Sequence, residues 1–113
     1  MKIAIPTDFD KRLVPLDAAM YVYLYDDQTG VLHEHENGGF GSKEATMAEI
    51  LSMNPDAITV RPGMLCPGSY AMSKGALEYA KVNSETLDEI LKNKEYEKNI
   101  VDDLEPEFYA EHE

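Results

Sequence analysis

The amino-acid sequence predicts an α/β fold: a five-stranded mixed sheet with strand order 3-2-1-4-5 and helices packed against it. Three observations support this prediction. Three short strand patterns joined by turns occupy residues 2–36. Helical and strand patterns then alternate over residues 43–92, which is typical of parallel strands joined by crossover helices. The length of 113 residues, with 43% hydrophobic residues, suits one domain with a buried core.

The first part of the chain contains the three antiparallel strands. KIAIP (residues 2–6) alternates, and we expect it to end at Pro6, because proline cannot donate to a sheet. MYVYLYD (20–26) is aromatic and β-branched, which favours a strand. Gly30 supplies the positive φ that the next turn needs. VLHEHE (31–36) alternates again and is expected to be an edge strand with its charges facing water.

The second part of the chain alternates helices with strands. Ser42 is expected to cap a helix that Asn54-Pro55 ends, and Ser84 to cap the last helix, whose apolar stripe is Leu87, Ile90 and Leu91. The elements between these caps are predicted in the order helix 43–53, strand 57–60, a short helix around 70–74 ending at Gly75, strand 77–82 and the last helix.

Two loops are predicted to meet at one end of this sheet. Ligands of open α/β sheets bind beyond the carboxyl ends of the strands, where the strand order reverses. Here that point lies between the first and fourth strands, which are followed by loops 7–19 and 61–69. The candidate binding residues come from both loops and are Thr7, Asp8, Gly63, Met64, Cys66, Pro67, Gly68 and Ser69.

The loop RPGMLCPGS (61–69) holds the only cysteine of the chain. Pro67 suits the first position of a helix, so Cys66 is expected at or near the N-cap, beside amides that favour negative charge. Gly63 and Gly68 allow a bulky ligand to approach the backbone. The thiol would be a soft metal ligand, with Met64 as a weaker second. Alternatively, Cys66 is a small buried apolar residue and the glycines only shape the turn.

His33 and His35 are a second candidate metal site. Residues two apart on a strand share a face, so both imidazoles could reach one metal ion. A third ligand at recognisable spacing is missing from the sequence. The alternative interpretation is a solvated face of an edge strand.

Composition narrows the classes of partner. The chain has 22 Asp and Glu against 10 Lys and Arg, so nucleic acid and anionic membranes would be repelled. It has no run of about 18 apolar residues, and we expect no membrane span. One cysteine and no signal-peptide pattern favour a cytoplasmic protein. We found neither a nucleophile paired with a base nor the Lys-Ser/Thr end of a phosphate loop, so we expect no enzymatic activity.

Residues 99–113 are treated as an acidic tail that follows a domain of residues 1–98. Residues 101–113 hold six acids and no Lys or Arg, and they show no sustained period. We expect a mobile tail, although Leu104, Phe108 and Tyr109 could dock on a partner or on the body of the chain. His112 also lies in this tail.

Four segments together resemble the dinitrogenase iron–molybdenum cofactor biosynthesis family: MKIAIPTD, YVYLYDDQTG, ENGGFGSKEATMAEIL and DAITVRPGMLCPGSYAMSKGALEYAKVNSETLDEIL. They cover about residues 1 to 92 in order and spacing. The resemblance implies a ribonuclease-H-like three-layer fold. It also implies that the protein binds an iron–sulfur or iron–molybdenum cluster and delivers it to a partner instead of turning over a substrate.

Two histidines that are common in that family are absent here. Pro15, Leu16 and Asp17 stand at the positions of an HFG element, and Gly39, Phe40 and Gly41 at those of a GHG-like element. Cluster binding would then depend on Cys66 and backbone amides. Nuclease activity, which the fold label invites, needs several carboxylates on central strands, and the interior of KIAIP has none.

These observations favour a non-enzymatic cytoplasmic carrier of an iron–sulfur or iron–molybdenum cluster or its precursor. Its expected partners are the cluster and a receiving or regulatory protein, and we expect a monomer or weak dimer. The alternative is a protein-interaction or regulatory module that kept the fold and lost the cluster, with its acidic tail docking on a basic partner.

Overall fold

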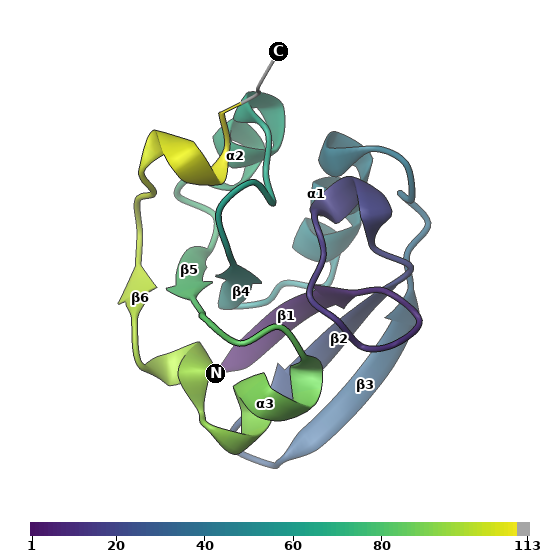
Figure 1. The fold of residues 1–113 in the computed structure, drawn as a ribbon, viewed down its shortest axis with the longest axis vertical. Coiled ribbons are helices and arrows are strands. Elements are labelled where there is room, and N and C mark those ends of the chain that lie inside the picture. The colour runs from purple at the N-terminus through teal and green to yellow at the C-terminus, as the bar shows by residue number, and fades with distance from the viewer. Residues whose placement is uncertain (111–113) are drawn as a thin grey trace.

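Six strands form one mixed sheet in the order β3-β2-β1-β4-β5-β6 in the computed structural model, which describes residues 1–110 (Figure 1). The strands are β1 (Lys2–Thr7), β2 (Tyr21–Asp26), β3 (Val31–Glu36), β4 (Ala57–Val60), β5 (Glu78–Lys81) and β6 (Ile100–Val101). The order 3-2-1-4-5 is confirmed for the first five strands. The expected number of strands was wrong, because the short β6 pairs with β5 and extends the sheet by one strand.

The direction of pairing changes at the centre of the sheet. β1 pairs antiparallel with β2, and β2 with β3, whereas β4 is parallel to both β1 and β5. The first three strands therefore form a meander, and the next two are joined through helices. The loops after β1 and β4 leave the sheet at the same end, as the strand order predicts.

Pro6 does not end β1, in contrast to our expectation. The strand continues to Thr7, and Pro6 lies opposite Val22 of β2. The Lys2 carbonyl accepts from Asp56 just before β4, and the Asp27 amide donates to the Met1 carbonyl beside β2. Backbone groups alternate in direction along a strand, so those of even residues in β1 face β4. The missing N–H of Pro6 is therefore on the β4 side, beyond the last β1–β4 pair, Ala4 with Ile58.

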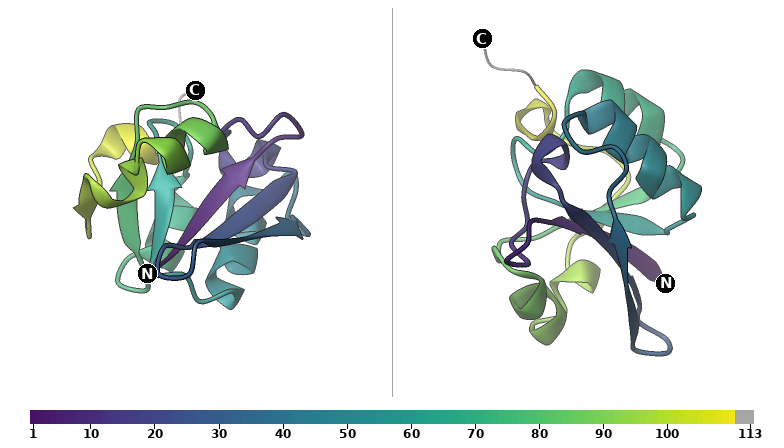
Figure 2. Two further views of the ribbon diagram at one scale, coloured as in Figure 1. Left: turned by 90° about the horizontal axis from the view of Figure 1, so that it is seen from below. Right: turned by 90° about the vertical axis from the view of Figure 1, so that its right-hand side faces the viewer.

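Helices cover both faces of the sheet, as Figure 2 shows. α1 (Lys43–Ser52) and α2 (Pro67–Ser73) lie side by side on one face, and α3 (Leu87–Lys92) lies on the other face with the short helix η2 (Glu95–Glu97). Ser42 caps α1 as predicted, since its hydroxyl accepts from the Ala45 amide at 3.1 Å. The cap of α3 is Thr86 and not Ser84, whose hydroxyl donates to the Glu95 carboxylate instead. No helix among residues 1–110 is both long and apolar enough to cross a membrane.

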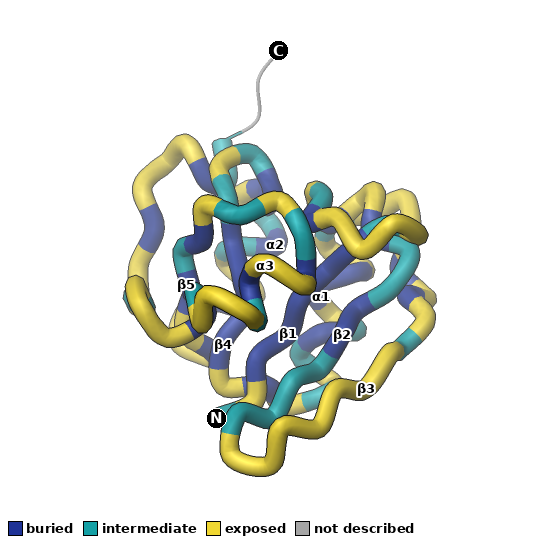
Figure 3. The backbone as a smooth tube through the Cα atoms, turned by 60° about the horizontal axis from the view of Figure 1, so that its bottom comes forward, coloured by how far each residue is buried: buried dark blue, intermediate teal, exposed yellow. Residues whose placement is uncertain are grey.

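The core lies on both faces of the central strands, whereas β3 is exposed along most of its length (Figure 3). Ile3 and Ile5 of β1 and Ile58 of β4 are fully buried. Tyr79 of β5 is also fully buried, and its hydroxyl is satisfied by the Ser73 hydroxyl of α2 at 2.7 Å. The central strands are thus the rigid support for the loops that follow β1 and β4.

Residues 100–110, here called the C-terminal segment, pack on the body of the chain. β6 is followed by the short helix η3 (Pro106–Phe108), and the side chains of Leu104 and Phe108 are only 6% and 5% exposed. We expected a mobile tail here, with docking on the body of the chain as the alternative. For residues 100–110 that expectation was wrong, because Leu104 and Phe108 are buried and β6 pairs with β5. Residues 111–113, with His112, lie outside the described residues.

Candidate functional site

The loops after β1 and β4 join at one end of the sheet. The amide of Leu16, in the short helix η1 (Leu16–Ala18), donates to the Met64 carbonyl at 3.1 Å. Thr46 of α1 is fully buried, and its hydroxyl donates to the Leu16 carbonyl at 2.8 Å. These contacts hold the first loop between the second loop and the start of α1, so three segments contribute to the site.

Cys66 borders a hollow between these segments. The hollow has a volume of about 280 Å³ and is lined by Asp17, Gly41, Ser42, Lys43, Glu44 and Cys66. Cys66 is the N-cap of α2, as the sequence predicts, with Pro67 as the first helical residue. Its Sγ accepts from the Ser69 amide at 3.4 Å, while its own amide donates to the Ser69 hydroxyl at 2.9 Å. Cys66 is 5% exposed, its Sγ caps α2, and the residue contributes to the lining of the hollow.

The charges around the hollow are mixed. Lys43 Nζ donates to the carbonyls of Gly63 and Leu65, each at 3.2 Å, and so ties the start of α1 to the second loop. Asp17 and Glu44 add two carboxylates to the lining. The Glu44 carboxylate lies so close to Gly68 that a Cβ there would be 2.5 Å from Glu44 Oε1. The first turn of α2 therefore already has a carboxylate beside it.

Most backbone amides of the second loop have partners within the chain. The Gly63 amide donates to the Glu107 carbonyl and the Leu65 amide to the Phe108 carbonyl, both at 3.0 Å. The Ser69 amide is used by Cys66 Sγ, and the Tyr70 amide by the Cys66 carbonyl at 2.9 Å. The C-terminal segment thus occupies two of the amides that the sequence offered to a ligand.

The other predicted residues of the two loops lie away from this hollow. Thr7 is buried and donates to the Asp8 carbonyl, and Asp8 Oδ1 accepts from the Asp10 and Arg12 amides at 2.9 and 3.0 Å, so both shape their own turn. Met64 is buried, and its sulfur accepts from the Arg61 amide at 3.2 Å. Met64 lines a separate hollow of about 300 Å³ with Leu13, Val14, Pro15, Arg61 and Pro62.

His33 and His35 do not line the Cys66 hollow. Both belong to the edge strand β3, on one face, with ring centroids 6.4 Å apart. Within residues 1–110, no group of three or more His, Cys, Asp or Glu side chains is arranged to hold a metal ion. The structure therefore does not bring the two histidines and Cys66 into one site.

Sequence reasoning missed Lys43 and Glu44. Apart from His33 and His35, its candidates came from the loops after β1 and β4, whereas α1 and α2 begin side by side at that end of the sheet. The available signal was the charged pair that directly follows the cap Ser42, since the first turn of a helix points toward whatever binds at that end of the sheet.

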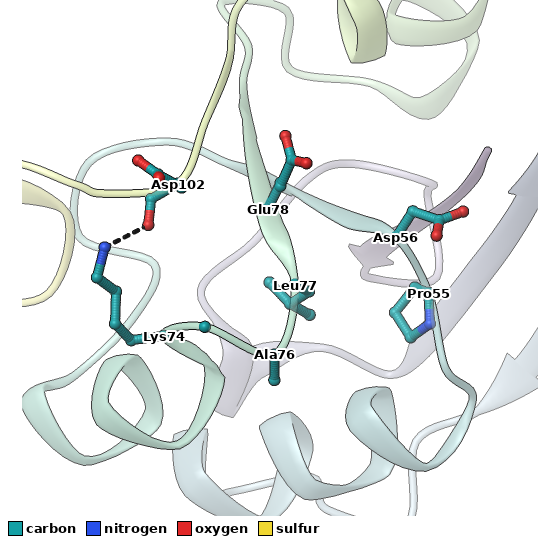
Figure 4. Close-up of a pocket in the computed structure, with 8 residues that line it drawn as sticks. Pro55, Asp56, Lys74, Ala76, Leu77, Glu78 and Asp102 are labelled. Carbon is teal, nitrogen blue, oxygen red and sulfur yellow. Dashed lines mark hydrogen bonds between the residues drawn. The ribbon is translucent and has the colours of Figure 1, made fainter.

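A larger hollow lies at the opposite end of the sheet and contains none of the predicted residues (Figure 4). Its volume is about 460 Å³, and carboxylates of Asp56, Glu78 and Asp102 line it. On one side of it Lys74 Nζ donates to the Asp102 carbonyl at 2.6 Å, and on the other side Asp56 accepts from the Lys2 amide. The Lys74 contact joins the end of α2 to the C-terminal segment.

Comparisons with known proteins identify the fold. The sequence matches no family model and no curated protein. Its structure is similar to a NifB-like protein from Thermotoga, with a TM-score of 0.65 at 17% identity over 88% of this chain and 90% of the other. The apo form of the orange protein from Desulfovibrio gigas gives a TM-score of 0.63 at 12% identity, covering 82% and 85%. A candidate dinitrogenase from Methanocaldococcus jannaschii gives 0.59 at 18%, covering 84% and 90%. At such identities these likenesses show the fold alone.

Proposed function

We propose that this protein is a non-enzymatic binding protein of the cofactor-biosynthesis type, which takes up an iron–sulfur or iron–molybdenum cluster or its precursor and passes it to another protein. The observation that carries the proposal is Cys66, the only cysteine of the chain, in the lining of a polar hollow of about 280 Å³. The three similar structures support it, because two are described as a NifB-like protein and a candidate dinitrogenase, and the third as an apo form.

The donors around the hollow decide which kind of cargo fits. A cluster fixed entirely by the protein commonly takes four cysteine thiolates, and this chain has one cysteine. Asp17 and Glu44 disfavour a highly anionic cargo, and the Lys43 amine is already bonded to two carbonyls. The site can offer a single protein thiolate, so a cargo that fits it brings its other ligands and carries little net negative charge. Such weak attachment suits a protein that must release what it binds.

Anaerobic reconstitution of the full chain with ferrous iron and sulfide tests this proposal. We expect visible charge-transfer absorption and bound iron in the parent protein, and loss of both in Cys66→Ser. Serine is a favoured N-cap residue, so this variant keeps α2 capped and removes only the thiol. A colourless, iron-free parent protein, or equal iron in Cys66→Ser, would contradict the proposal.

A second candidate function is a protein-interaction module that has lost the cargo. The favouring observation is the C-terminal segment, which bonds the amides of Gly63 and Leu65 and turns its acids outward. Asp102, Asp103, Glu105 and Glu107 are exposed while Leu104 and Phe108 are buried, so the docked segment presents carboxylates to a basic partner.

Co-purification of partners from the source organism separates the two candidates. If the interaction module is correct, Asp102→Asn with Glu107→Gln weakens partner binding and Cys66→Ser leaves it unchanged. If the carrier is correct, the receiving protein binds the iron-loaded parent more tightly than Cys66→Ser. If partner binding is the same in the parent protein, in Asp102→Asn with Glu107→Gln and in Cys66→Ser, the interaction-module hypothesis is wrong.

A further inference from the structure

The outer edge of β3 is one of the two edges of the sheet, and the two-residue strand β6 forms the other. β3 is the terminal strand beside β2, and its six residues are exposed except for the half-buried His35. Figure 3 shows this strand running along one side of the molecule. An exposed edge strand presents unpaired amides and carbonyls that can pair with another strand.

The direction of those backbone groups follows from hydrogen bonds at the strand ends. The Asn37 amide donates to the Met20 carbonyl at 3.0 Å, on the β2 side. Along a strand of an antiparallel sheet, the backbone N–H and C=O groups of one residue point to the neighbouring strand on one side, and those of the next residue point to the opposite side. The backbone amides and carbonyls of His33 and His35 therefore bond to β2. Those of Leu32, Glu34 and Glu36 point away from the sheet.

A second copy of the chain can pair with this edge about a two-fold axis at Glu34. The outward-facing groups then bond between copies, with Glu34 opposite Glu34 of the partner subunit and Leu32 opposite Glu36 of the partner subunit. His33 comes opposite His35 of the partner subunit in a non-hydrogen-bonded pair. Side chains in such pairs approach most closely, with Cα atoms about 4.5 Å apart. A two-fold axis perpendicular to the sheet keeps the same face of β3 on the same side in both copies. The imidazoles of His33 and His35 from the two copies, four in all, therefore lie on one face of the joined sheet.

We propose that β3 carries half of a divalent transition-metal site, and that a second copy of this chain completes it by pairing β3 with β3. Zinc is bound by four ligands in its structural sites, and imidazole nitrogen is among its preferred donors. One copy offers two imidazoles, with ring centroids 6.4 Å apart. Two imidazoles on one tetrahedral ion have centroids roughly 5 Å apart, given Zn–N bonds of about 2.1 Å. Small side-chain rotations close that difference.

Charge repulsion on the other face of β3 opposes this pairing when no metal is bound. Two Glu34 carboxylates lie directly opposite each other in the paired register, and like charges in that arrangement are destabilising. Glu34 is held on its own sheet by the Tyr23 hydroxyl, which donates to it at 2.6 Å. Each chain also carries a formal net charge of −12, so two copies repel each other. A bound dication offsets this repulsion and supplies the bonds that hold the copies together.

Zinc titration of the chelator-treated full chain tests the proposal, with the mass followed by light scattering during gel filtration. We expect the mass to double from 12.7 kDa with one zinc ion bound per two chains, and a chelator to reverse the change. His33→Ala and His35→Ala should each abolish the zinc-induced dimer, whereas His112→Ala should retain it. Cobalt in place of zinc should give the visible bands of a tetrahedral site.

Two substitutions at Glu34 separate edge pairing from other modes of binding. Glu34→Pro removes an outward amide and leaves both histidines, so the zinc-induced dimer should be lost. Glu34→Gln removes the like-charge contact, so dimerisation should need less zinc. A chain that stays monomeric with zinc, a dimer that survives both histidine substitutions, or a dimer unaffected by Glu34→Pro would overturn the proposal. None of these outcomes depends on cargo binding at Cys66.

Discussion

The rings of Tyr70 and Tyr109 stack face to face, with centroids 4.2 Å apart and planes within 2° of parallel. Tyr70 belongs to α2, the helix that Cys66 caps, and Tyr109 follows η3 in the C-terminal segment. The Tyr70 hydroxyl also donates to the Asp103 carboxylate and accepts from the Leu104 amide. One aromatic side chain therefore joins the candidate site to the last described part of the chain.

Phe108→Ala should destabilise the fold by about 3 kcal/mol, the usual cost of removing a buried phenylalanine side chain. Phe108 is 5% exposed, and Lys81 Nζ lies 5.3 Å from its ring centroid. Urea unfolding followed by circular dichroism measures the change. The neighbouring Glu107→Ala is the control, because Glu107 uses its carbonyl and not its exposed side chain. Equal effects of the two substitutions would show that the segment adds little to stability.

Replacing each of two glycines near the site by alanine should reduce the stability of the fold by very different amounts. A Cβ at Gly39 would lie 2.4 Å from the backbone of Ala45 and Thr46, so α1 would have to move. A Cβ at Gly68 would meet only the end of the flexible Glu44 side chain, which can rotate away. We expect Gly39→Ala to cost about 3 kcal/mol and Gly68→Ala less than about 1 kcal/mol. Thermal and urea unfolding of both variants would check this order, and the reverse order would contradict the packing described here.

The C-terminal segment should dock more weakly in acid. The pKa of Asp103 is lowered by its hydrogen bond from Tyr70 and by Lys74, and the pKa of Glu105 is lowered by its hydrogen bond from Lys81. A carboxyl whose pKa is lowered on folding stabilises the folded state fully above its ordinary pKa. That contribution is lost as the pH falls through the lowered value. The urea midpoint should therefore fall as the pH drops below the ordinary pKa values of 4.5 for Glu105 and 3.8 for Asp103, because both contributions are progressively lost there.

The matched control for this pH dependence is the double substitution Asp103→Asn with Glu105→Gln. It removes both titrating groups and keeps their size, so the urea midpoint should change less with pH than in the parent protein. Both carboxyls are exposed, so salt should reduce the difference between the two pH profiles. An identical pH profile for the two proteins would show that these carboxyls do not stabilise the docked segment.

The strand order and the Ser42 cap could be predicted from the sequence because each depends on local signals. Gly30 marks the hairpin with a φ of +74°, and the alternation of helix and strand after residue 43 indicates parallel pairing. The α3 cap was misassigned because Ser84 and Thr86 both have capping side chains, and only the tertiary contact of Ser84 with Glu95 separates them. The strand β6 has two residues, which is too short for any period to appear.

The position of Cys66 could also be predicted from the sequence, but its surroundings could not. Pro67 after Cys66 indicates a helix start, and the structure has one there. The hollow beside the thiol depends on Lys43 and Glu44 of α1, and the crossing of two helices cannot be read from either helix alone. The use of the Gly63 and Leu65 amides by Glu107 and Phe108 joins segments more than 40 residues apart, which no local pattern indicates.

The proline in the central strand also has a consequence for the shape of the protein's upper rim. Because Pro6 has no amide hydrogen to donate toward β4, the paired register of β1 with β4 has Ala4 with Ile58 as its last pair, below the loops that follow both strands. The substitution Pro6→Ala would supply that hydrogen, so we expect it to extend the pairing of β1 with β4 toward the loop that holds Cys66.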